Sequence, residues 1–151
     1  LLHEWQRCKA LGVDVAMTMG RRLSDSEFRL RMQAEQLLLE TAVPIVKDVD
    51  RFLADVPGIM ILIDRSGCAL HISGDPRVGE FAASRTGIVV GSQWDEATAG
   101  TNGIGTALAK RQPVHVFASE HFCEGWQSWS CCAAPIFDAD GHTVLGVIDY
   151  T

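Results

Sequence analysis

The stretch GIMILID at residues 58–64 constrains the fold more than any other part of the chain. Its apolar side chains do not alternate with polar ones, which is typical of a strand covered on both faces. The RSG triplet at 65–67 predicts a turn, and residues 68–73 alternate between apolar and polar, as in a partner strand with one wetter face. These segments predict a hairpin within a sheet that carries other elements on both sides.

Further strands are predicted at 113–118, 129–138 and 143–151, and the DADG turn should join the last two as an antiparallel hairpin. A short helix is predicted at the start of the chain, ending at Gly12. It places four residues on one face: Leu1, Trp5, Cys8 and Leu11. Strands that come mostly as hairpins, with helices before and between them, indicate an α+β fold.

A long helix should begin at Ser24, because Ser24 and Glu27 form a capping box. Pro44 should bend or split this helix, since proline lacks the amide donor. Beyond Pro44, one apolar stripe continues to about residue 55: Ile45, Val46, Val49, Phe52 and Leu53. A third, short helix should start at Asp75 and Pro76, with Val78, Phe81 and Ala82 turned inward.

The length of 151 residues and the 47% of hydrophobic residues fit one domain. Within it we expect N-terminal helices at 1–55, which serve packing or dimerisation, and a sensory core at 56–151. The chain starts without methionine and stops inside the strand-like run VIDYT, so we expect a fragment of a longer protein.

The net charge and the cysteines of the chain exclude several classes of protein. A net charge of −6 opposes direct contact with nucleic acid, and no apolar run is long enough to cross a bilayer. Five cysteines without regular spacing indicate reduced thiols and a cytoplasmic protein. His71, His115 and His142 are expected at the surface.

The glycine-rich segment QWDEATAGTNGIGTAL at 93–108 raises the question of a phosphate loop. A dinucleotide fingerprint would need a third glycine in place of Leu108 and a strand before it, and a P-loop would need lysine and a hydroxyl residue after Gly105. Both fail, so no nucleotide cofactor is expected. Alternatively, Gly100, Gly103 and Gly105 let a helix start lie close to a sheet, with Ile104 and Leu108 facing the core.

The blocks GTNGIGTAL, EHF and WSCCAAPI, with EWQRCKALGVD near the start, resemble the GAF sensory domain of sigma-54-dependent transcriptional activators, the group that responds to acetoin and related alcohols and ketones. The resemblance is good over residues 58–151. It implies a central antiparallel sheet of five or six strands with helices on both faces. It also implies a homodimeric input domain that is followed by an AAA+ ATPase and a helix-turn-helix domain.

The resemblance further implies a pocket between the sheet and the loops around 94–105 and 119–129. An aromatic wall with a few polar groups suits a small alcohol, ketone or hydroxyketone. The candidate ligand-binding residues are Trp94, Thr101, Asn102, His121, Phe122, Trp126, Trp129 and Cys131. Burial in the core or helix capping would explain several of them equally well.

Three alternatives remain open. The domain could dock another protein, as some members of this group are thought to do. His121, Cys123 and Cys131 could hold a metal ion or form a thiol redox switch, although adjacent cysteines point to opposite faces of a strand. Cys131 and His121 could imitate a nucleophile and its base, but no orienting acid or oxyanion turn is identifiable, so we do not expect an enzyme.

Overall fold

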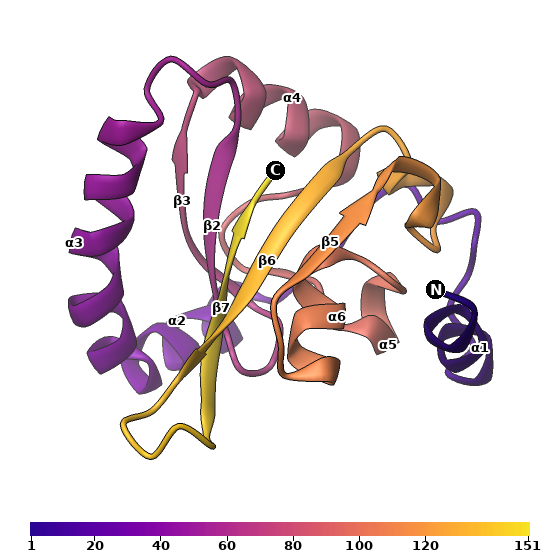
Figure 1. Ribbon diagram of the computed structural model, residues 1–151, viewed down its shortest axis with the longest axis horizontal. Helices are drawn as coiled ribbons and strands as arrows, with labels where there is room; N and C mark the ends of the chain where they lie inside the picture. The colour runs from indigo at the N-terminus through magenta and orange to yellow at the C-terminus, as the bar shows by residue number, and fades with distance from the viewer.

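The computed structural model describes residues 1–151 and is built on one five-stranded antiparallel sheet (Figure 1). The strands lie in the order β3-β2-β7-β6-β5. Their bounds are β2 (Ile59–Asp64), β3 (Ala69–Gly74), β5 (Val114–Phe117), β6 (Ser130–Phe137) and β7 (Val144–Tyr150). Both predicted hairpins, β2–β3 and β6–β7, are confirmed.

Every residue of β2 is buried, as its unbroken apolar sequence predicts. The strand lies between β3 and β7, so its odd and even positions face different layers. Ile59, Ile61 and Ile63 join the larger core, while Leu62 joins a smaller one on the opposite face. The sheet is therefore covered on both faces, and the predicted α+β class is confirmed.

Helices α2 (Asp25–Ala34) and α3 (Gln36–Phe52) cover the Leu62 face of the sheet (Figure 1). The capping box at Ser24 is present as predicted. The split at Pro44 is wrong: the chain leaves helical geometry at Glu35 instead, and α3 continues through Pro44. Leu38 and Val46 are buried on either side of this proline, so packing holds both halves of α3 in place.

The apolar stripe of α3 is only partly core. Val46 is buried, but Ile45 is exposed and the Phe52 side chain is 87% exposed. The helix ends at Phe52, three residues before the predicted end. Because Ile45 and Phe52 are exposed, the outer face of α3 presents apolar side chains to solvent.

None of the helices is long and apolar enough to span a membrane.

The other face of the sheet carries α4 (Pro76–Thr86), α5 (Glu96–Ala99) and α6 (Gly103–Lys110). A two-stranded pair, β1 (Arg21–Arg22) with β4 (Ser92–Gln93), lies outside the main sheet. Asp75 caps α4, as predicted. Phe81 of α4 is 52% exposed rather than inward, and its ring packs against that of Trp129 at a centroid distance of 5.7 Å.

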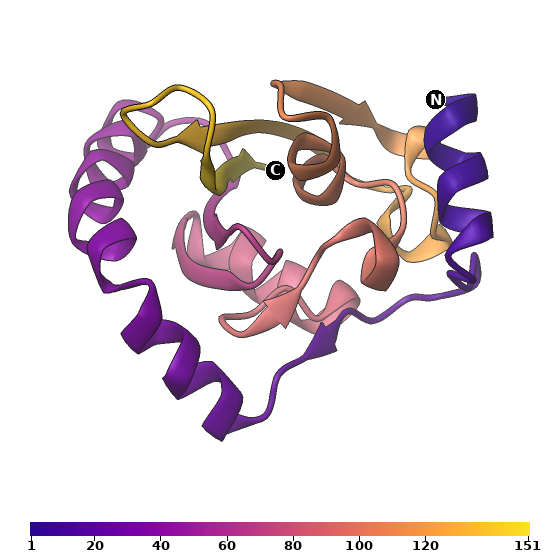
Figure 2. The ribbon, with the colours of Figure 1, turned by 90° about the horizontal axis from the view of Figure 1, so that it is seen from below.

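Helix α1 (Leu2–Ala10) lies at the end of the molecule opposite α3 (Figure 2). Arg7 binds both carboxylate oxygens of Glu96 at 2.5 and 2.8 Å, and Lys110 binds Glu4 at 3.1 Å. Cys8 is buried, but the predicted inward face of this helix is incomplete, since two of its members are exposed: Leu1 and Leu11. Ion pairs thus supplement a narrow apolar contact.

The surface positions of His115 and His142 are confirmed, but His71 is half-buried. His71 pairs with Leu62 across the β2–β3 hairpin, on the part of the sheet that α3 covers. Burial lowers the pKa of its imidazole. The sequence alternation placed His71 on the wetter face and could not show that a helix crosses this face.

Candidate functional site

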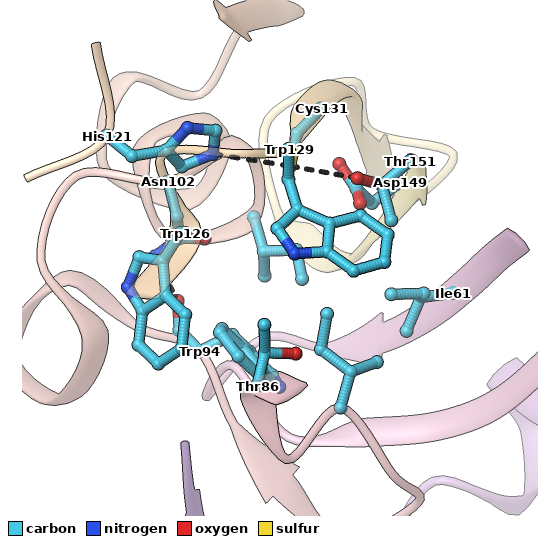
Figure 3. A pocket seen from close by; sticks show the side chains of 12 residues that line it. Ile61, Thr86, Trp94, Asn102, His121, Trp126, Trp129, Cys131, Asp149 and Thr151 are labelled. Carbon is cyan, nitrogen blue, oxygen red and sulfur yellow. Dashed lines mark hydrogen bonds between the residues drawn. The ribbon is translucent and has the colours of Figure 1, made fainter. Parts of the chain in front are cut away.

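A small cavity lies between the sheet and the segments that follow α4 and β5 (Figure 3). Its volume is about 20 Å³, which is room for about one water molecule. Twelve residues line it: Ile61, Thr86, Ile88, Trp94, Asn102, Ile104, His121, Trp126, Trp129, Cys131, Asp149 and Thr151. The wall is therefore mainly aromatic and aliphatic, with a few polar side chains.

Strand register forms the floor of the cavity. Asp149 of β7 pairs with Ile61 of β2 on one side and with Ala133 of β6 on the other. Side chains two residues apart share a face of a strand, so Cys131 lies on the same side as Ala133. The cavity wall thus contains one carboxyl group in a row of mostly apolar side chains.

The glycine segment brings the start of α6 close to this floor. A Cβ atom added at Gly103 would lie 2.5 Å from Cβ of Cys131, and one at Gly105 would lie 2.7 Å from the backbone oxygen of Trp94. Asn102 caps α6 by accepting from the Gly105 amide at 3.0 Å. Its amide nitrogen donates to the backbone oxygens of Trp94 and Gly100. The predicted packing against the sheet is confirmed for Gly103, whereas Gly105 packs against the backbone of residues 94–96.

Three tryptophans surround the cavity (Figure 3), and they differ in their hydrogen bonds. Trp94 donates its indole N–H to Ser92 at 2.7 Å, and Trp126 donates to the Ala99 carbonyl at 2.9 Å. The Trp94 and Trp126 rings meet edge to face at 4.9 Å. The indole nitrogen of Trp129 is buried without a protein acceptor. Trp129 therefore has a donor available for a bound molecule.

Asp149 is the most unusual residue of the wall. Its side chain is buried, and neither carboxyl oxygen has a hydrogen-bond partner in the protein. Burial raises the pKa of this carboxyl to about 8, because the surroundings disfavour the charged form. Sequence reasoning missed Asp149, although a single carboxyl on the inward register of an otherwise apolar strand was a usable signal.

His121 and Cys131 form a second polar contact. Nδ1 of His121 lies 2.9 Å from the Ala118 carbonyl, which can only accept, so Nδ1 carries the proton. Nε2 is then free to accept from the Cys131 thiol at 3.4 Å. Burial lowers the pKa of His121 and raises that of Cys131, so both groups stay neutral. This pair lacks the thiolate of a nucleophilic site.

Six of the eight predicted ligand-binding residues line the cavity: Trp94, Asn102, His121, Trp126, Trp129 and Cys131. Thr101 and Phe122 do not. The Thr101 hydroxyl lies 3.3 Å from Sγ of Cys8, and the Phe122 ring packs edge to face on Trp5 at 5.6 Å. Both side chains support α1 instead of the cavity.

The wall also contains six residues that were not predicted to bind a ligand: Ile61, Thr86, Ile88, Ile104, Asp149 and Thr151. Thr86 donates to the Ala82 carbonyl at 2.8 Å within α4, so its hydroxyl is already engaged. Thr151 donates to the Ser130 carbonyl at 3.2 Å and lies 3.3 Å from Sγ of Cys131. Asp149 and Trp129 remain the wall residues with unpaired polar atoms.

The structure does not bring together the ligands of the metal-site alternative. No group of three or more His, Cys, Asp or Glu side chains lies close enough to hold a metal ion. Cys123, which would have joined His121 and Cys131, donates to the Ala99 carbonyl at 3.3 Å and approaches the Asp14 carbonyl at 3.5 Å. The loop thus directs Cys123 toward other partners, and two ligands remain.

Comparison with known proteins supports the sequence resemblance. The GAF domain family model matches residues 37–151. The acetoin dehydrogenase operon transcriptional activator AcoR of Bacillus subtilis is 34% identical over 150 residues, which cover 99% of this chain and 24% of that protein. The propane 2-monooxygenase operon transcriptional activator MimR of Mycolicibacterium goodii is 29% identical, over 100% of this chain and 25% of that protein. The chain thus spans about a quarter of the length of these relatives.

Among solved structures, the crystal structure of the E. coli DhaR(N)–DhaL complex is similar, with a TM-score of 0.91 and 22% identity. The match covers 99% of this chain and 50% of that chain, and it supports the fold. With the match of the family model over most of its length, the chain belongs to the GAF domain family.

Proposed function

We propose that this domain is the input domain of a cytoplasmic transcriptional activator of a catabolic operon and binds a small oxygenated organic effector in the aromatic cavity. The effector would be an alcohol, a ketone or a hydroxyketone. The observation that carries the proposal is the pair of unpartnered polar groups, the Trp129 indole N–H and the Asp149 carboxyl, in an otherwise largely apolar wall. Buried polar groups need partners, and a hydroxyl or carbonyl oxygen would provide them.

The size of the cavity bears on how binding would act. A volume of about 20 Å³ suits one water molecule, and acetoin is several times larger. Binding would therefore move part of the wall, and the segments around 94–105 and 119–129 contribute several of its residues. An effector that binds the opened arrangement better than the closed one would shift the population toward it.

The contacts of α1 couple this helix to the moving wall. The Trp5 indole donates to the Glu120 carbonyl at 2.9 Å, next to the cavity residue His121. Arg7 binds Glu96, which follows the cavity residue Trp94 closely in sequence. We propose that α1 follows the movement of the wall and that the effector signal passes to an attached AAA+ ATPase, which in turn works with a helix-turn-helix domain.

Dimerisation through the N-terminal helices is part of the same proposal. The outer face of α3 exposes Leu37, Ile45 and Phe52, and Leu30 is exposed on α2. Monomeric proteins seldom expose a continuous apolar patch without a use for it. Light scattering of the wild type and a Phe52→Glu variant tests this part: the proposal expects a dimer that the variant converts to a monomer.

Titration of the domain with a panel of small compounds tests the proposed effector class. Thermal unfolding and tryptophan fluorescence would be followed with acetoin, acetone, propan-2-ol and ethanol, with hexane-saturated buffer as an apolar control. A saturable response to an oxygenated compound supports the proposal, and the Trp129→Phe variant should weaken it. No response to any compound would contradict the small-molecule proposal.

Protein docking is the second candidate function. The small cavity favours it, and the similar domain of the E. coli structure is in a complex with the protein DhaL. A docking domain would respond to none of the compounds in the panel but would bind a protein through an exposed apolar face. The panel titration therefore separates the two candidates.

A further inference from the structure

Asp149 differs from the other polar residues of the cavity wall, because both of its carboxyl oxygens lack a protein partner. We propose that Asp149 meets its ligand as a neutral carboxylic acid, which donates one hydrogen bond and accepts another, so that the site selects uncharged hydroxyl- or carbonyl-bearing molecules and rejects carboxylates. This inference rests on the proposed function, because it assumes a small-molecule ligand in this cavity. It assigns the selection of uncharged ligands over carboxylates to Asp149.

The first support is the position of the side chain. Asp149 lies between Ile61 and Ala133 on the neighbouring strands, and its Oδ1 atom would be 2.7 Å from a Cβ atom at Gly103. It is buried, lines the cavity, and has two oxygens without a protein partner (Figure 3). A ligand in the cavity can therefore reach both oxygens without displacing a protein hydrogen bond.

The second support is that no positively charged side chain in the cavity wall could stabilise an ionised Asp149. No lysine, arginine or glutamate lines the cavity. The titratable side chains that face Asp149 are His121, from the connection after β5, and Cys131 of β6. Burial lowers the pKa of the imidazole and raises that of the thiol, so both are neutral near pH 7. Neither can stabilise an ionised Asp149.

The start of α6 is the one feature that favours the carboxylate. Gly103 places the amino-terminal amides of α6 near Asp149, and the helix dipole stabilises negative charge there. None of these amides donates a hydrogen bond to Asp149 and no cation lines the cavity, whereas burial disfavours the charged form and raises the pKa of this carboxyl to about 8. The neutral acid is therefore the main form near pH 7.

Selectivity follows from this protonation state. A neutral carboxyl group can donate to a ligand carbonyl or hydroxyl and accept from a hydroxyl, whereas an ionised one can only accept. A carboxylate ligand would bring an unpaired charge into a wall that has no cation, which is strongly unfavourable. An ammonium ligand would instead stabilise the ionised form of Asp149, whose proton would then be released to solvent.

Acetoin and lactate form a matched probe pair, because lactate carries a carboxylate where acetoin carries an acetyl group. Their affinities would be measured by tryptophan fluorescence between about pH 6 and pH 9, in the wild type and in Asp149→Asn. The asparagine amide both donates and accepts, so it mimics the neutral acid and cannot titrate. His121→Asn serves as the control for the second titratable group.

The proposal expects three results. Wild-type affinity for acetoin is nearly constant up to about pH 7 and then falls, approaching about tenfold for each pH unit above about 8. Asp149→Asn keeps its affinity within about threefold of the wild-type value at pH 6 and shows no fall at high pH. Lactate binds at least about a hundredfold more weakly than acetoin.

Other results would overturn it. If Asp149→Asn abolishes binding while wild-type affinity rises with pH, the carboxylate is the binding form. If the profiles of wild type and Asp149→Asn coincide, Asp149 has no role in recognition. A carboxyl-carbon NMR titration of Asp149 without ligand tests the protonation state independently: an ionised group at pH 6 overturns the inference, whatever binds. Absence of acetoin binding with a protonated Asp149 instead contradicts the proposed effector class and, with it, the recognition role.

Discussion

Ile61 and Asp149 occupy paired positions on the neighbouring strands β2 and β7, and both side chains line the same cavity. An isoleucine and a carboxyl group thus share one small wall, in which the carboxyl has no partner in the protein. An ionised Asp149 raises the free energy of the folded state but not that of the unfolded chain, in which water solvates the carboxylate. Stability should therefore depend on pH through this residue.

The pKa of Asp149 is about 8 in the folded domain, against an ordinary value of 3.8. Between these values the folded form holds a proton that the unfolded chain releases, so this residue makes stability fall as pH rises, by at most about 1.4 kcal/mol per pH unit. Urea unfolding at several pH values should show this slope in the wild type relative to Asp149→Asn. Parallel profiles for the two proteins would contradict the prediction.

Neither Glu4 nor His121 imitates this effect. The pKa of Glu4 is lowered to about 2, so its contribution is present above about pH 4.5 and is lost only as pH falls toward 2. The lowered pKa of His121 makes stability fall as pH drops below about 6.5, which is the opposite sign. Both effects are common to wild type and Asp149→Asn and cancel in the comparison.

Two glycine substitutions test the close packing of α6. Gly105→Ala should destabilise the domain by about 1–3 kcal/mol, because the new Cβ would lie 2.7 Å from backbone atoms of Trp94 and Glu96. Gly79→Ala in α4 is the matched control, since its nearest neighbour would be an Ile59 methyl at 3.8 Å. It should stabilise by about 0.5–1 kcal/mol. Equal effects in urea unfolding would argue against tight packing at Gly105.

The ion pair of α1 gives a third prediction. Arg7→Ala removes both bonds to the buried Glu96 carboxylate, which keeps only the Thr106 hydroxyl as a side-chain donor. We expect a loss of about 1–3 kcal/mol and faster hydrogen exchange in residues 2–10. Arg51→Ala breaks a pair with Asp48 in which both side chains are exposed, and should change stability by less than about 0.5 kcal/mol. A loss no larger than that of Arg51→Ala would show that α1 is held by apolar contacts.

Trp129→Phe keeps an aromatic ring in the wall but removes the indole N–H. The affinity for an oxygenated effector should fall about five- to tenfold if this donor binds the effector. Trp5→Phe is the control, because its indole donates to the Glu120 carbonyl and does not line the cavity. Calorimetry with the best compound of the panel would measure both. Unchanged affinity in Trp129→Phe would remove this residue from the binding site.

Much of the sheet follows from local sequence. The unbroken apolar run at 58–64, the turn signals after it and the DADG turn identify both hairpins, since strand period and turn residues are local properties. The break at Glu35 in place of Pro44 was not predictable in this way. It depends on how α2 and α3 pack against the sheet, and buried residues on both sides of Pro44 outweigh its missing hydrogen bond.

The site was predictable in part. Strand alternation and the family motifs pointed to Trp129 and Cys131, which do line the cavity. Thr101 and Phe122 lie on loops, where sequence spacing does not fix the direction of a side chain, and both turn toward α1. Asp149 escaped because an acidic residue near a strand end is usually solvated. Its place in an otherwise apolar strand was a signal, and the pairing with Ile61 and Ala133 shows that it faces the cavity.

The indole groups offer the most direct test of effector binding in the cavity. The chain has four tryptophans, so a nitrogen–proton correlation spectrum resolves four indole signals and can be followed during titration with acetoin. The account predicts a saturable shift that is largest for Trp129, whose indole has no protein acceptor, and smallest for Trp5, which lies outside the cavity. Saturable binding that shifts Trp5 alone, or no shift of the three cavity indoles at any concentration, would contradict it.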